Sequence, residues 1–376
     1  MIYLDNAATT KPSETAKNAA LEAMECFGNP SSLHRLGLDA EKIIKKSREA
    51  VAGVLGVPAG DIYFTSGGTE ANNLAILGYC RANQRRGKHI ITSKIEHPSV
   101  LAPMEQLEKE GFSVDRIGVD ADGVFSLEEF SQKLCEDTIF VSVMAVNNEV
   151  GTVQPIAKIR ELMKKKAPNA ILHVDAVQAF GKIVLKPKQW GVELMSVSAH
   201  KIHGLKGCGA LYVGGVRLNP LQLGGGQQKD LRSGTENVPG IAAFGAAAGA
   251  VTPESDEIFQ TRTALKQGFS EQIERVVFHG SDTEQSGYLL NVSFLGVKAE
   301  VLLHTLEAKG IYVSGGSACS SHKPMPSHVL TAMGCKKEEI DSAIRFSFSQ
   351  PLTDAEIELV VKTVCDSVSE LRRFMR

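Results

Sequence analysis

The amino-acid sequence predicts an α/β protein with a large domain, built on a mostly parallel seven-stranded sheet between helices, and a smaller α+β C-terminal domain. Two observations lead to this prediction. As far as about residue 252, short apolar segments alternate with segments of helical periodicity, which is typical of a parallel sheet covered on both faces. Beyond that point strands and helices are mixed. We therefore expect the large domain to span residues 13–252 and the small domain to comprise residues 1–12 and 253–376.

The elements of the large domain follow from the apolar spacing and its interruptions. Helices are expected at 13–26 and, after a loop at 27–34, at 38–55, where Gly56 is a stop signal. The predicted strands are 62–66, 89–93, 113–119, 139–146, 171–177, 194–200 and 207–213. Further helices are expected from Thr69, from Pro98 and near 156–166, and a buried helix in the uncharged stretch 237–253.

The small domain has its own signals. Strands are predicted at 290–294, 311–315 and 343–349, and the last helix begins with the capping box Thr353-Asp-Ala-Glu356. The segment from about 315 to 326 is rich in Gly, Ser and Pro and lacks an apolar pattern. It predicts a mobile loop.

Composition excludes several classes of protein. The 376 residues carry 41 Lys plus Arg against 43 Asp plus Glu, so no broad basic field for nucleic acid or an anionic membrane is expected. The start, MIYLDNAATT, lacks the pattern of a signal peptide. Seven cysteines without a CxxC pair indicate neither a disulfide framework nor a zinc site, so no metal is expected. These features favour a soluble, cytoplasmic protein.

Polar residues follow five of the predicted strands at the point where each strand ends. They are Ser66–Thr69, Glu96–His97, Asn147–Glu149, Asp175 with Gln178, and His200–Lys201. Ligand sites in parallel sheets lie at the carboxyl ends of the strands. Any one of these residues alone is typical of a cap or a turn, but their coincidence predicts an active site at one rim of the sheet.

Three requirements at this rim point to pyridoxal phosphate. Lys201 lies between two histidines; a lysine in such surroundings condenses with aldehydes, although a solvated lysine after an edge strand is the alternative. The glycine turn Thr65–Glu70 directs backbone N–H groups and a helix dipole at one point, which suits a phosphate, and Ser198 and His200 add donors. Asp175 ends a buried strand and needs a positive partner, such as a protonated pyridine nitrogen.

Other residues suit the same cofactor and a substrate. Gln178 could donate to the phenolic oxygen of the ring. His97 directly precedes Pro98, so it could stack on the ring and shuttle protons, or simply cap a helix. Arg345 lies inside an apolar strand, where a bound carboxylate would explain it.

A series of motifs occurs in unbroken order from Tyr3 to about residue 375: YLDNAATT, FGNPSSLH, FTSGGTEANNLAI, HIITSKIEH, VNNEVGTVQP, HVDAVQ, SAHKIHGLKGCGALYV, GGGQ, RSGTEN, VSGGSACSS and IRFSFS. With these motifs the chain resembles the cysteine desulfurases, fold-type I pyridoxal phosphate enzymes related to the aminotransferases. The series is far more specific than any single motif.

The resemblance implies a role for each matching residue. Lys201 would form the internal aldimine, Asp175 would partner the pyridinium nitrogen, Gln178 would contact the phenolate oxygen, and His97 would be the stacking acid/base. The phosphate would be held by Gly68, Thr69, Ser198 and His200, while Asn148 would lie beside cofactor and substrate and Arg345 would bind the substrate carboxylate. Thr235 would reach the phosphate of a neighbouring subunit, which implies a homodimer.

The resemblance also implies a reaction. L-Cysteine would displace Lys201, which then removes the α-proton, and the Cys319 thiolate would attack the substrate sulfur. The products would be alanine and a persulfide on Cys319, which the loop at 315–326 would carry to an acceptor protein. That acceptor could be an iron-sulfur scaffold, a tRNA-thiolation protein or a relay; the chain ends directly after its last predicted helix, without the longer tail that helps some relatives to dock a scaffold.

Three alternatives remain. An aminotransferase of the same fold would need no thiol, and Cys319 in a Gly/Ser loop argues against it. A non-catalytic sulfur carrier or scaffold would not need the intact set of Lys201, Asp175 and His97. Selenocysteine lyase activity is separated from desulfuration by the relative rates on the two amino acids.

Overall fold

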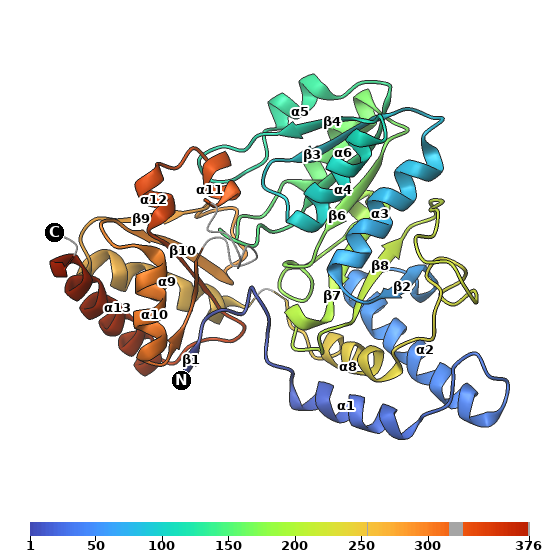
Figure 1. Cartoon of the computed structure of the whole chain (residues 1–376), viewed down its shortest axis with the longest axis horizontal. Coiled ribbons are helices and arrows are strands. Elements are labelled where there is room, and N and C mark those ends of the chain that lie inside the picture. Colours follow the sequence, from blue (N-terminus) through green and yellow to red (C-terminus); the bar gives the residue numbers. More distant parts are fainter. Residues whose placement is uncertain (254, 316–325, 375–376) are drawn as a thin grey trace.

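The computed structural model describes residues 1–253, 255–315 and 326–374. The chain forms a larger and a smaller part, which lie side by side in Figure 1 with the first residues running between them. Within these described ranges, no helix combines the length and the apolar character that crossing a bilayer requires.

The larger part is built on a seven-stranded sheet in the order β2-β8-β7-β6-β5-β3-β4. Neighbouring strands are parallel except at β8, which is antiparallel to both β2 and β7. This confirms the mostly parallel sheet, and the predicted strands differ from the observed ones only at their ends. The strands are Ile62–Thr65 (β2), His89–Ser93 (β3), Ser113–Ile117 (β4), Thr138–Met144 (β5), Ile171–Asp175 (β6), Leu194–Ser198 (β7) and Gly209–Val213 (β8).

Helices cover both faces of this sheet because successive side chains of a strand point to opposite faces. On β8, Leu211 and Val213 belong to the core shared with α3 and α4, whereas Ala210 and Tyr212 belong to the core shared with α1, α2, α6 and α8. The helices are Glu14–Glu25 (α1), Arg35–Leu55 (α2), Gly68–Asn83 (α3), Pro98–Lys109 (α4), Leu127–Lys133 (α5), Ile156–Lys166 (α6), Pro187–Trp190 (α7) and Val238–Ala248 (α8), with 3-10 turns at Ala59–Asp61 (η1) and Ala199–Lys201 (η2).

Helix α2 begins earlier than the predicted residue 38. Its N-cap is His34, whose side chain accepts a hydrogen bond from the backbone of Gly37, a capping role that lies outside the usual small polar set. The C-terminal end is as predicted: Gly56 has a φ of 65°, the left-handed conformation that glycine adopts readily.

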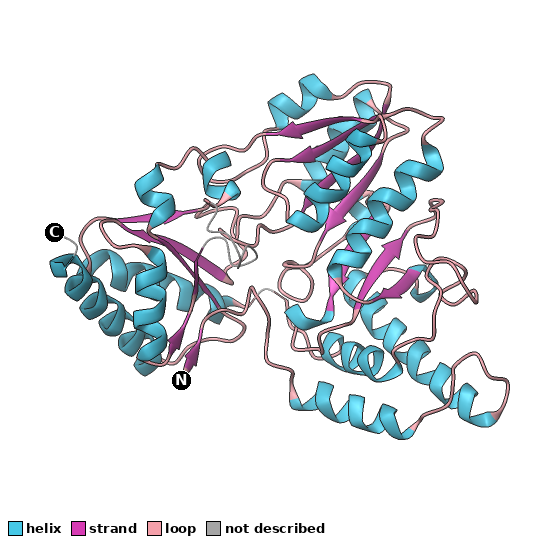
Figure 2. Cartoon of the chain, viewed as in Figure 1, coloured by secondary structure: helices cyan, strands magenta, loops and turns pink. Residues whose placement is uncertain are grey.

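The smaller part contains a four-stranded antiparallel sheet in the order β12-β13-β10-β9, with a separate parallel pair formed by β1 and β11. Figure 2 shows its long helices gathered at the outer side of the molecule. The strands are Ile2–Tyr3 (β1), Val276–His279 (β9), Leu289–Phe294 (β10), Ile311–Tyr312 (β11), Ser314–Gly315 (β12) and Ala343–Ser347 (β13). The helices are Asp256–Gln272 (α9), Ala299–Ala308 (α10), His328–Ala332 (α11), Lys337–Asp341 (α12) and Asp354–Phe374 (α13).

The two faces of the smaller sheet differ in character. On β13, Ile344 and Phe346 belong to an apolar core with residues of α9, α10 and α13. The alternating residue Arg345 points to the other face, where its Nη1 donates to the backbone oxygen of Asn148 in the larger part. The alternation of one strand therefore turns a single arginine toward the rim of the large sheet.

The predicted capping box of the last helix is present. The backbone N–H of Thr353 donates to Glu356 Oε2 at 2.9 Å, and the Glu356 N–H donates to Thr353 Oγ1 at 3.3 Å. Helix α13 starts at the next residue, as this motif predicts. The domain boundaries at residues 12 and 252 remain a prediction, which the separate core containing residues 2–7 and 258–368 supports.

Candidate active site

The carboxyl ends of β2, β3, β5, β6 and β7 share one rim of the large sheet, because these strands all point the same way. The buried side chain of Asn72 on α3 links two of these ends. Its Nδ2 donates to Asp175 Oδ2 at 2.8 Å and to Ser99 Oγ at 2.9 Å, and Ser99 Oγ lies 2.8 Å from His97 Nδ1. The predicted residues His97 and Asp175 are thus brought to one place.

A cavity of about 320 Å³, here named the α3 pocket, lies at the start of helix α3. Its lining includes all four residues predicted to hold a phosphate: Gly68, Thr69, Ser198 and His200. Helix α3 has 16 residues, and its N-cap Gly67 offers no side-chain oxygen to the first N–H groups of the helix. The pocket therefore combines free backbone donors with the positive end of a helix dipole, the arrangement that favours an anion.

Two observations show that the α3 pocket fits a phosphate. Ser198 Oγ is buried and has no hydrogen-bond partner among the described residues, so an oxygen-rich ligand would satisfy it. A Cβ on Gly68 would lie 2.6 Å from Val177 Cγ2, so the side-chain space at this position is already filled and only glycine keeps the backbone where it is.

His200 remains neutral at the edge of the α3 pocket. Its Nδ1 lies 3.1 Å from Thr9 Oγ1. Burial, together with the positive charges of Lys201, Lys206 and Lys182, lowers its pKa to about 4. A neutral ring at physiological pH can donate one hydrogen bond to an anion without adding charge.

Lys201 ends the 3-10 turn η2 that follows β7. Its Nζ donates to the backbone oxygens of Ala7 at 2.5 Å and Ala8 at 2.8 Å, which belong to the N-terminal segment. The turn is tight, because a Cβ on Gly204 would lie 2.9 Å from Ala199 Cβ. The sequence context thus holds the lysine amine at the rim, where an aldehyde could reach it.

Asp175 is buried and accepts two hydrogen bonds, from Asn72 Nδ2 and, at 2.9 Å, from the backbone N–H of Val177. Two donors fix the plane of the carboxylate and leave lone pairs for a further donor. A protonated ring nitrogen fits this capacity, since it would supply both a hydrogen bond and the missing positive charge.

His97 caps the start of helix α4, which is the alternative role that the sequence suggested for it. The backbone N–H of Ser99 donates to His97 Nδ1 at 3.1 Å. Burial lowers the pKa of His97, an effect that the nearby Asp175 carboxylate only partly offsets. Because Nδ1 accepts this hydrogen bond, the proton of the neutral ring lies on Nε2. Helix capping uses Nδ1 and leaves Nε2 for acid/base chemistry.

Arg345 is almost fully buried and carries an ion pair from its Nη2 to Asp5 Oδ1 at 2.9 Å. Its Nη1 is satisfied by the backbone of Asn148, whereas its Nε is buried without a partner among the described residues. An unsatisfied guanidinium N–H beside the rim fits the predicted carboxylate-binding role. It also places Asn148 at the site through its backbone.

Two buried carboxyl groups border the same rim. Glu96 Oε1 accepts from Ser93 Oγ at 2.5 Å and from the Met144 N–H at 2.9 Å, and burial raises its pKa to about 8. Burial also raises the pKa of Glu149 to about 7, although it accepts a hydrogen bond from Ser327 Oγ at 2.5 Å. Both groups favour the protonated form over part of the physiological range.

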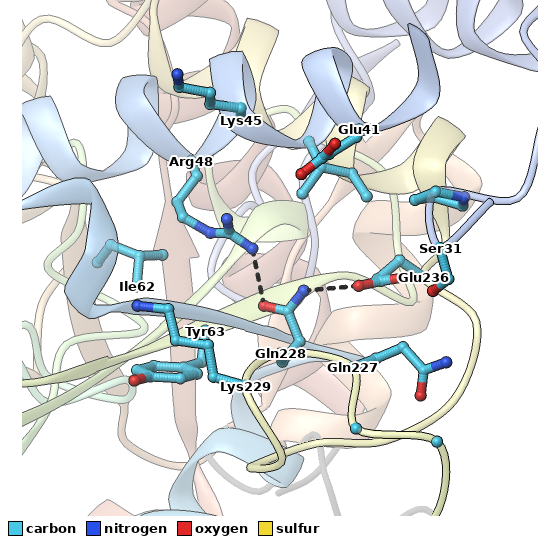
Figure 3. A pocket seen from close by; sticks show the side chains of 14 residues that line it. Ser31, Glu41, Lys45, Arg48, Ile62, Tyr63, Gln227, Gln228, Lys229 and Glu236 are labelled. Atoms are coloured by element: carbon cyan, nitrogen blue, oxygen red, sulfur yellow. Dashed lines mark hydrogen bonds between the residues drawn. The ribbon is translucent and has the colours of Figure 1, made fainter. Parts of the chain in front are cut away.

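The segment that carries Thr235 is held by a buried glutamine. Figure 3 shows Gln228 between Arg48 of α2 and Glu236: Arg48 Nη2 donates to Gln228 Oε1 at 3.2 Å and Gln228 Nε2 donates to Glu236 Oε1 at 3.1 Å. The three residues line a cavity of about 270 Å³. Thr235 itself lines a different, smaller cavity beside the α3 pocket, so within one chain it is not among the residues that line the α3 pocket.

Cys319 lies outside the described residues, as does most of the loop predicted at 315–326. Three residues that contact the candidate site were not identified from the sequence: Asp5, Asn72 and Lys182. The Nζ of Lys182 donates to Gln178 Oε1 at 3.1 Å. A signal existed for one of them, because Lys182 interrupts the otherwise uncharged stretch AVQAFGKIVL.

Comparisons with known proteins agree with this geometry. The family model "Aminotransferase class-V" matches residues 2–360. "Cysteine desulfurase IscS" of Methanosarcina thermophila is 42% identical over 376 residues, covering 99% of this chain and 93% of the relative. Among solved structures, one named "NIFS-LIKE PROTEIN" is 36% identical, covers 98% of this chain and 100% of its own, and superposes with a TM-score of 0.91. Another, named "SspA in complex with cysteine", is 32% identical, covers 94% and 100%, and has a TM-score of 0.83.

The rim of the large sheet thus presents a lysine amine, a buried aspartate and an unsatisfied serine hydroxyl, and an arginine of the smaller part faces it. The similarity extends over essentially the whole chain. On these grounds the chain belongs to the class-V aminotransferase family and, within it, to the cysteine desulfurases.

Proposed function

We propose that this protein converts L-cysteine to L-alanine with pyridoxal phosphate and transfers the sulfur to Cys319. The observation that carries the proposal is the convergence of Lys201, Asp175 and the unsatisfied Ser198 at one rim, facing Arg345 from the other part of the chain. The name of the Methanosarcina relative and the cysteine complex of SspA support the same substrate.

The chain's own residues would hold the cofactor as follows. Lys201 would attach the aldehyde, the α3 pocket would hold the phosphate, and Asp175 would accept a hydrogen bond from the ring nitrogen. Gln178 would donate to the ring's phenolic oxygen. When bound, pyridoxal phosphate supplies an electron sink for the α-carbon of an amino acid.

Substrate binding and proton transfer would fall to three further groups. The unsatisfied Nε of Arg345 would donate to the α-carboxylate of cysteine, with Asn148 beside it. The amine of Lys201, once released from the cofactor, would take the α-proton. The proton on Nε2 of His97 would exchange with the substrate, since Nδ1 accepts from the helix start.

The sulfur transfer balances without an external oxidant. The Cys319 thiolate would attack the sulfur of the bound cysteine, so that an S–S bond forms while the C–S bond of the substrate breaks. The electron pair of the broken bond stays on the substrate carbon, which is protonated to give alanine. Net, one thiol and one cysteine become one persulfide and one alanine.

A homodimer and a protein acceptor complete the proposal. Large apolar side chains of α1, the loop after it and the start of α2 are exposed in the single chain, among them Leu21, Met24, Phe27 and Leu33. Such a group of exposed apolar residues supports a protein interface, and a second copy would also supply Thr235 to the phosphate.

The acceptor of the sulfur would be an iron-sulfur scaffold, a thiolation protein or a relay. The six described cysteines are all free thiols, which favours the cytoplasm as the location of the protein.

Alanine release from L-cysteine tests the function directly, with purified protein, added pyridoxal phosphate and dithiothreitol as the sulfur acceptor. We expect alanine from the wild type and none above background from Cys319→Ala or Lys201→Ala, whereas Lys188→Ala, which changes an exposed lysine on α7, should retain activity. Equal alanine release from Cys319→Ala would remove the thiol from the reaction and favour a lyase. Transfer of the amino group to a 2-oxo acid, without sulfide, would favour an aminotransferase.

A further inference from the structure

Lys182 is a buried amine that the proposed reaction does not use. Only 5% of its surface is exposed. Its Nζ lies 5.6 Å from the centre of the Tyr288 ring, and the charged groups that act on it, Lys201 and Arg345, are both cations. A buried amine without an anionic partner is costly, and a methionine of similar length would pack here without that cost. Stability alone therefore does not explain a lysine at this position.

The turn that carries Lys182 is built for close packing. Gly181 has a φ of 74°, and a Cβ at this position would lie 2.7 Å from Val251 Cγ1. The Lys182 N–H donates to the Ala179 oxygen at 3.0 Å. The backbone at Lys182 is thus fixed by close packing of the turn, and burial holds the side chain inside.

A chain of hydrogen bonds joins Lys182 to Lys201. Lys182 Nζ donates to Gln178 Oε1 at 3.1 Å, Gln178 Nε2 donates to the Ala7 oxygen at 2.8 Å, and the same oxygen accepts from Lys201 Nζ. Both ends of the Gln178 carboxamide are therefore fixed, which leaves the second hydrogen of Nε2 for another oxygen. Lys182 and Lys201 also line one cavity of about 360 Å³, distinct from the α3 pocket.

We propose that Lys182 is a positioning residue for the cofactor: it fixes the carboxamide of Gln178 and sets the balance of charge around Lys201. The proposal rests on the proposed function, because Gln178 is the expected partner of the phenolic oxygen. In this role Lys182 would act through Gln178 and through its charge, without touching the substrate or the reacting atoms.

The sign of the effect follows from the groups that face Lys182. Gln178 faces it from the same turn, Tyr288 from the smaller part, Lys201 from η2 and Arg345 from β13. Burial, with the charges of Lys201 and Arg345, lowers the pKa of Lys182 to about 7, so the amine carries charge increasingly as the pH falls below that value. Below that pH, removing the amine would remove a positive charge near the bond between Lys201 and the cofactor. Protonation of that bond would become easier, and a phenolic oxygen less well held by Gln178 would act in the same direction.

The test uses the full chain loaded with pyridoxal phosphate and follows the visible absorbance of the cofactor as a function of pH. In Lys182→Met we expect the midpoint of this titration to move up by about one pH unit, a tenfold change in proton affinity, and cofactor loss on dilution to be about tenfold faster. Lys186→Met, which changes an exposed lysine on the same segment, should match the wild type. An unchanged midpoint together with unchanged cofactor retention in Lys182→Met would overturn the proposal.

A double-mutant cycle separates positioning from packing. If Lys182 acts through Gln178, the shift caused by Lys182→Met should be less than half as large in a Gln178→Leu background. If the role of Lys182 is purely structural, Lys182→Met should cause the same shift of the midpoint in both backgrounds and should lower the melting temperature. That result would also overturn the proposal.

Should the methionine variant fail to fold, the same titration is made with Lys182→Gln, which keeps a hydrogen-bond donor but carries no charge. A wild type that gives no visible absorbance with pyridoxal phosphate would contradict the proposed function itself, an outcome distinct from an unaltered Lys182→Met.

Discussion

The carboxylate of Asp5 holds one side of the Arg345 guanidinium, with 2.9 Å between Asp5 Oδ1 and Arg345 Nη2, although 340 residues separate them in the sequence. Arg345 is also the expected partner of the substrate carboxylate. Asp5 orients the guanidinium but also neutralises part of its charge, so the two carboxylates would compete for the same cation if Arg345 binds the substrate as proposed.

Asp5→Asn should therefore strengthen cysteine binding while weakening the fold. The asparagine oxygen can still accept from Arg345, but the competing negative charge is gone, and we expect KM for L-cysteine to fall about three- to tenfold, as for a change of about 1 kcal/mol. The melting temperature should fall by about 2–4 °C, because a largely buried cation loses its counterion. A raised KM with an unchanged melting temperature would show that orientation, and not charge, is the contribution of Asp5.

Gly68→Ala should expel the cofactor. The added methyl group would lie 2.6 Å from Val177 Cγ2, so the start of α3 would have to shift away from the proposed phosphate site. We expect pyridoxal phosphate to be lost on dialysis at least about tenfold faster than from the wild type, as for the loss of one charge-assisted hydrogen bond. Gly53→Ala is the matched control, since nothing lies within 4 Å of a Cβ there and α2 should gain about 0.5–1 kcal/mol. Equal retention by both variants would place the phosphate elsewhere.

Asp175→Asn should bind the cofactor poorly and lose turnover. A neutral amide cannot keep the ring nitrogen protonated, and the loss of one hydrogen bond to a charged partner predicts a fall in kcat on the order of 100-fold. The comparison is made by alanine release against Asp366→Asn, which changes an aspartate on α13, far from the rim. Wild-type turnover in Asp175→Asn would assign the ring nitrogen to another group.

Mixing Lys201→Ala, which should be inactive, with Thr235→Ala, which should lose most of its activity through a weakened phosphate site, tests whether two subunits share one site. In a heterodimer of Lys201→Ala and Thr235→Ala subunits, one site would carry both changes and the other would carry neither if Thr235 serves the neighbouring subunit. Activity should then recover to about a quarter of the wild-type level after unfolding and refolding the mixture, since half of the dimers are mixed and each has one intact site. No recovery, with dimers present by sedimentation, would mean that Thr235 serves its own chain.

Glu96 predicts a pH dependence of stability. Its pKa in the folded chain is raised to about 8, whereas in the unfolded chain it titrates near 4.5, so the folded state holds an extra proton between these values. The contribution of protonated Glu96 to the free energy of unfolding is therefore fully present below about pH 4.5 and is lost as the pH rises toward 8. Urea unfolding should show Glu96→Gln gaining about 3–5 kcal/mol on the wild type between pH 5 and pH 8.5. The exposed change Glu105→Gln should show no such gain, and parallel curves for all three proteins would mean that Glu96 stays ionised.

The features of the fold that depend on local patterns could be predicted from the sequence. Strands, crossover helices and the residues at strand ends all follow from apolar spacing and glycine turns, so the rim with His97, Asp175 and Lys201 could be placed in advance. Asn72, Asp5 and Lys182 could not, because each acquires its role from a partner that only the folded chain brings near. Asn72 lies on an ordinary helical segment and meets Asp175 only after β6 has joined the sheet.

The direction of β8 was not predicted either. Its apolar residues are compatible with both orientations. The connection from β7 through η2 is short and contains no crossover helix, so β8 runs antiparallel to β7. The same short connection leaves Lys201 at the strand end and keeps it out of a crossover helix.

The N-terminal segment has a consequence for the order of events during synthesis. Its residues pair with Ile311 through β1, with Ser347 through Ala7, and with Lys201 through the Ala7 and Ala8 oxygens. The residues of this segment are thus made long before they can find their places, because their partners on β11 and β13 are translated more than 300 residues later. A nascent chain could form the large sheet, but the carbonyl groups that receive the Lys201 amine would be seated only once the closing strands were made. Cofactor loading would then be a post-translational event.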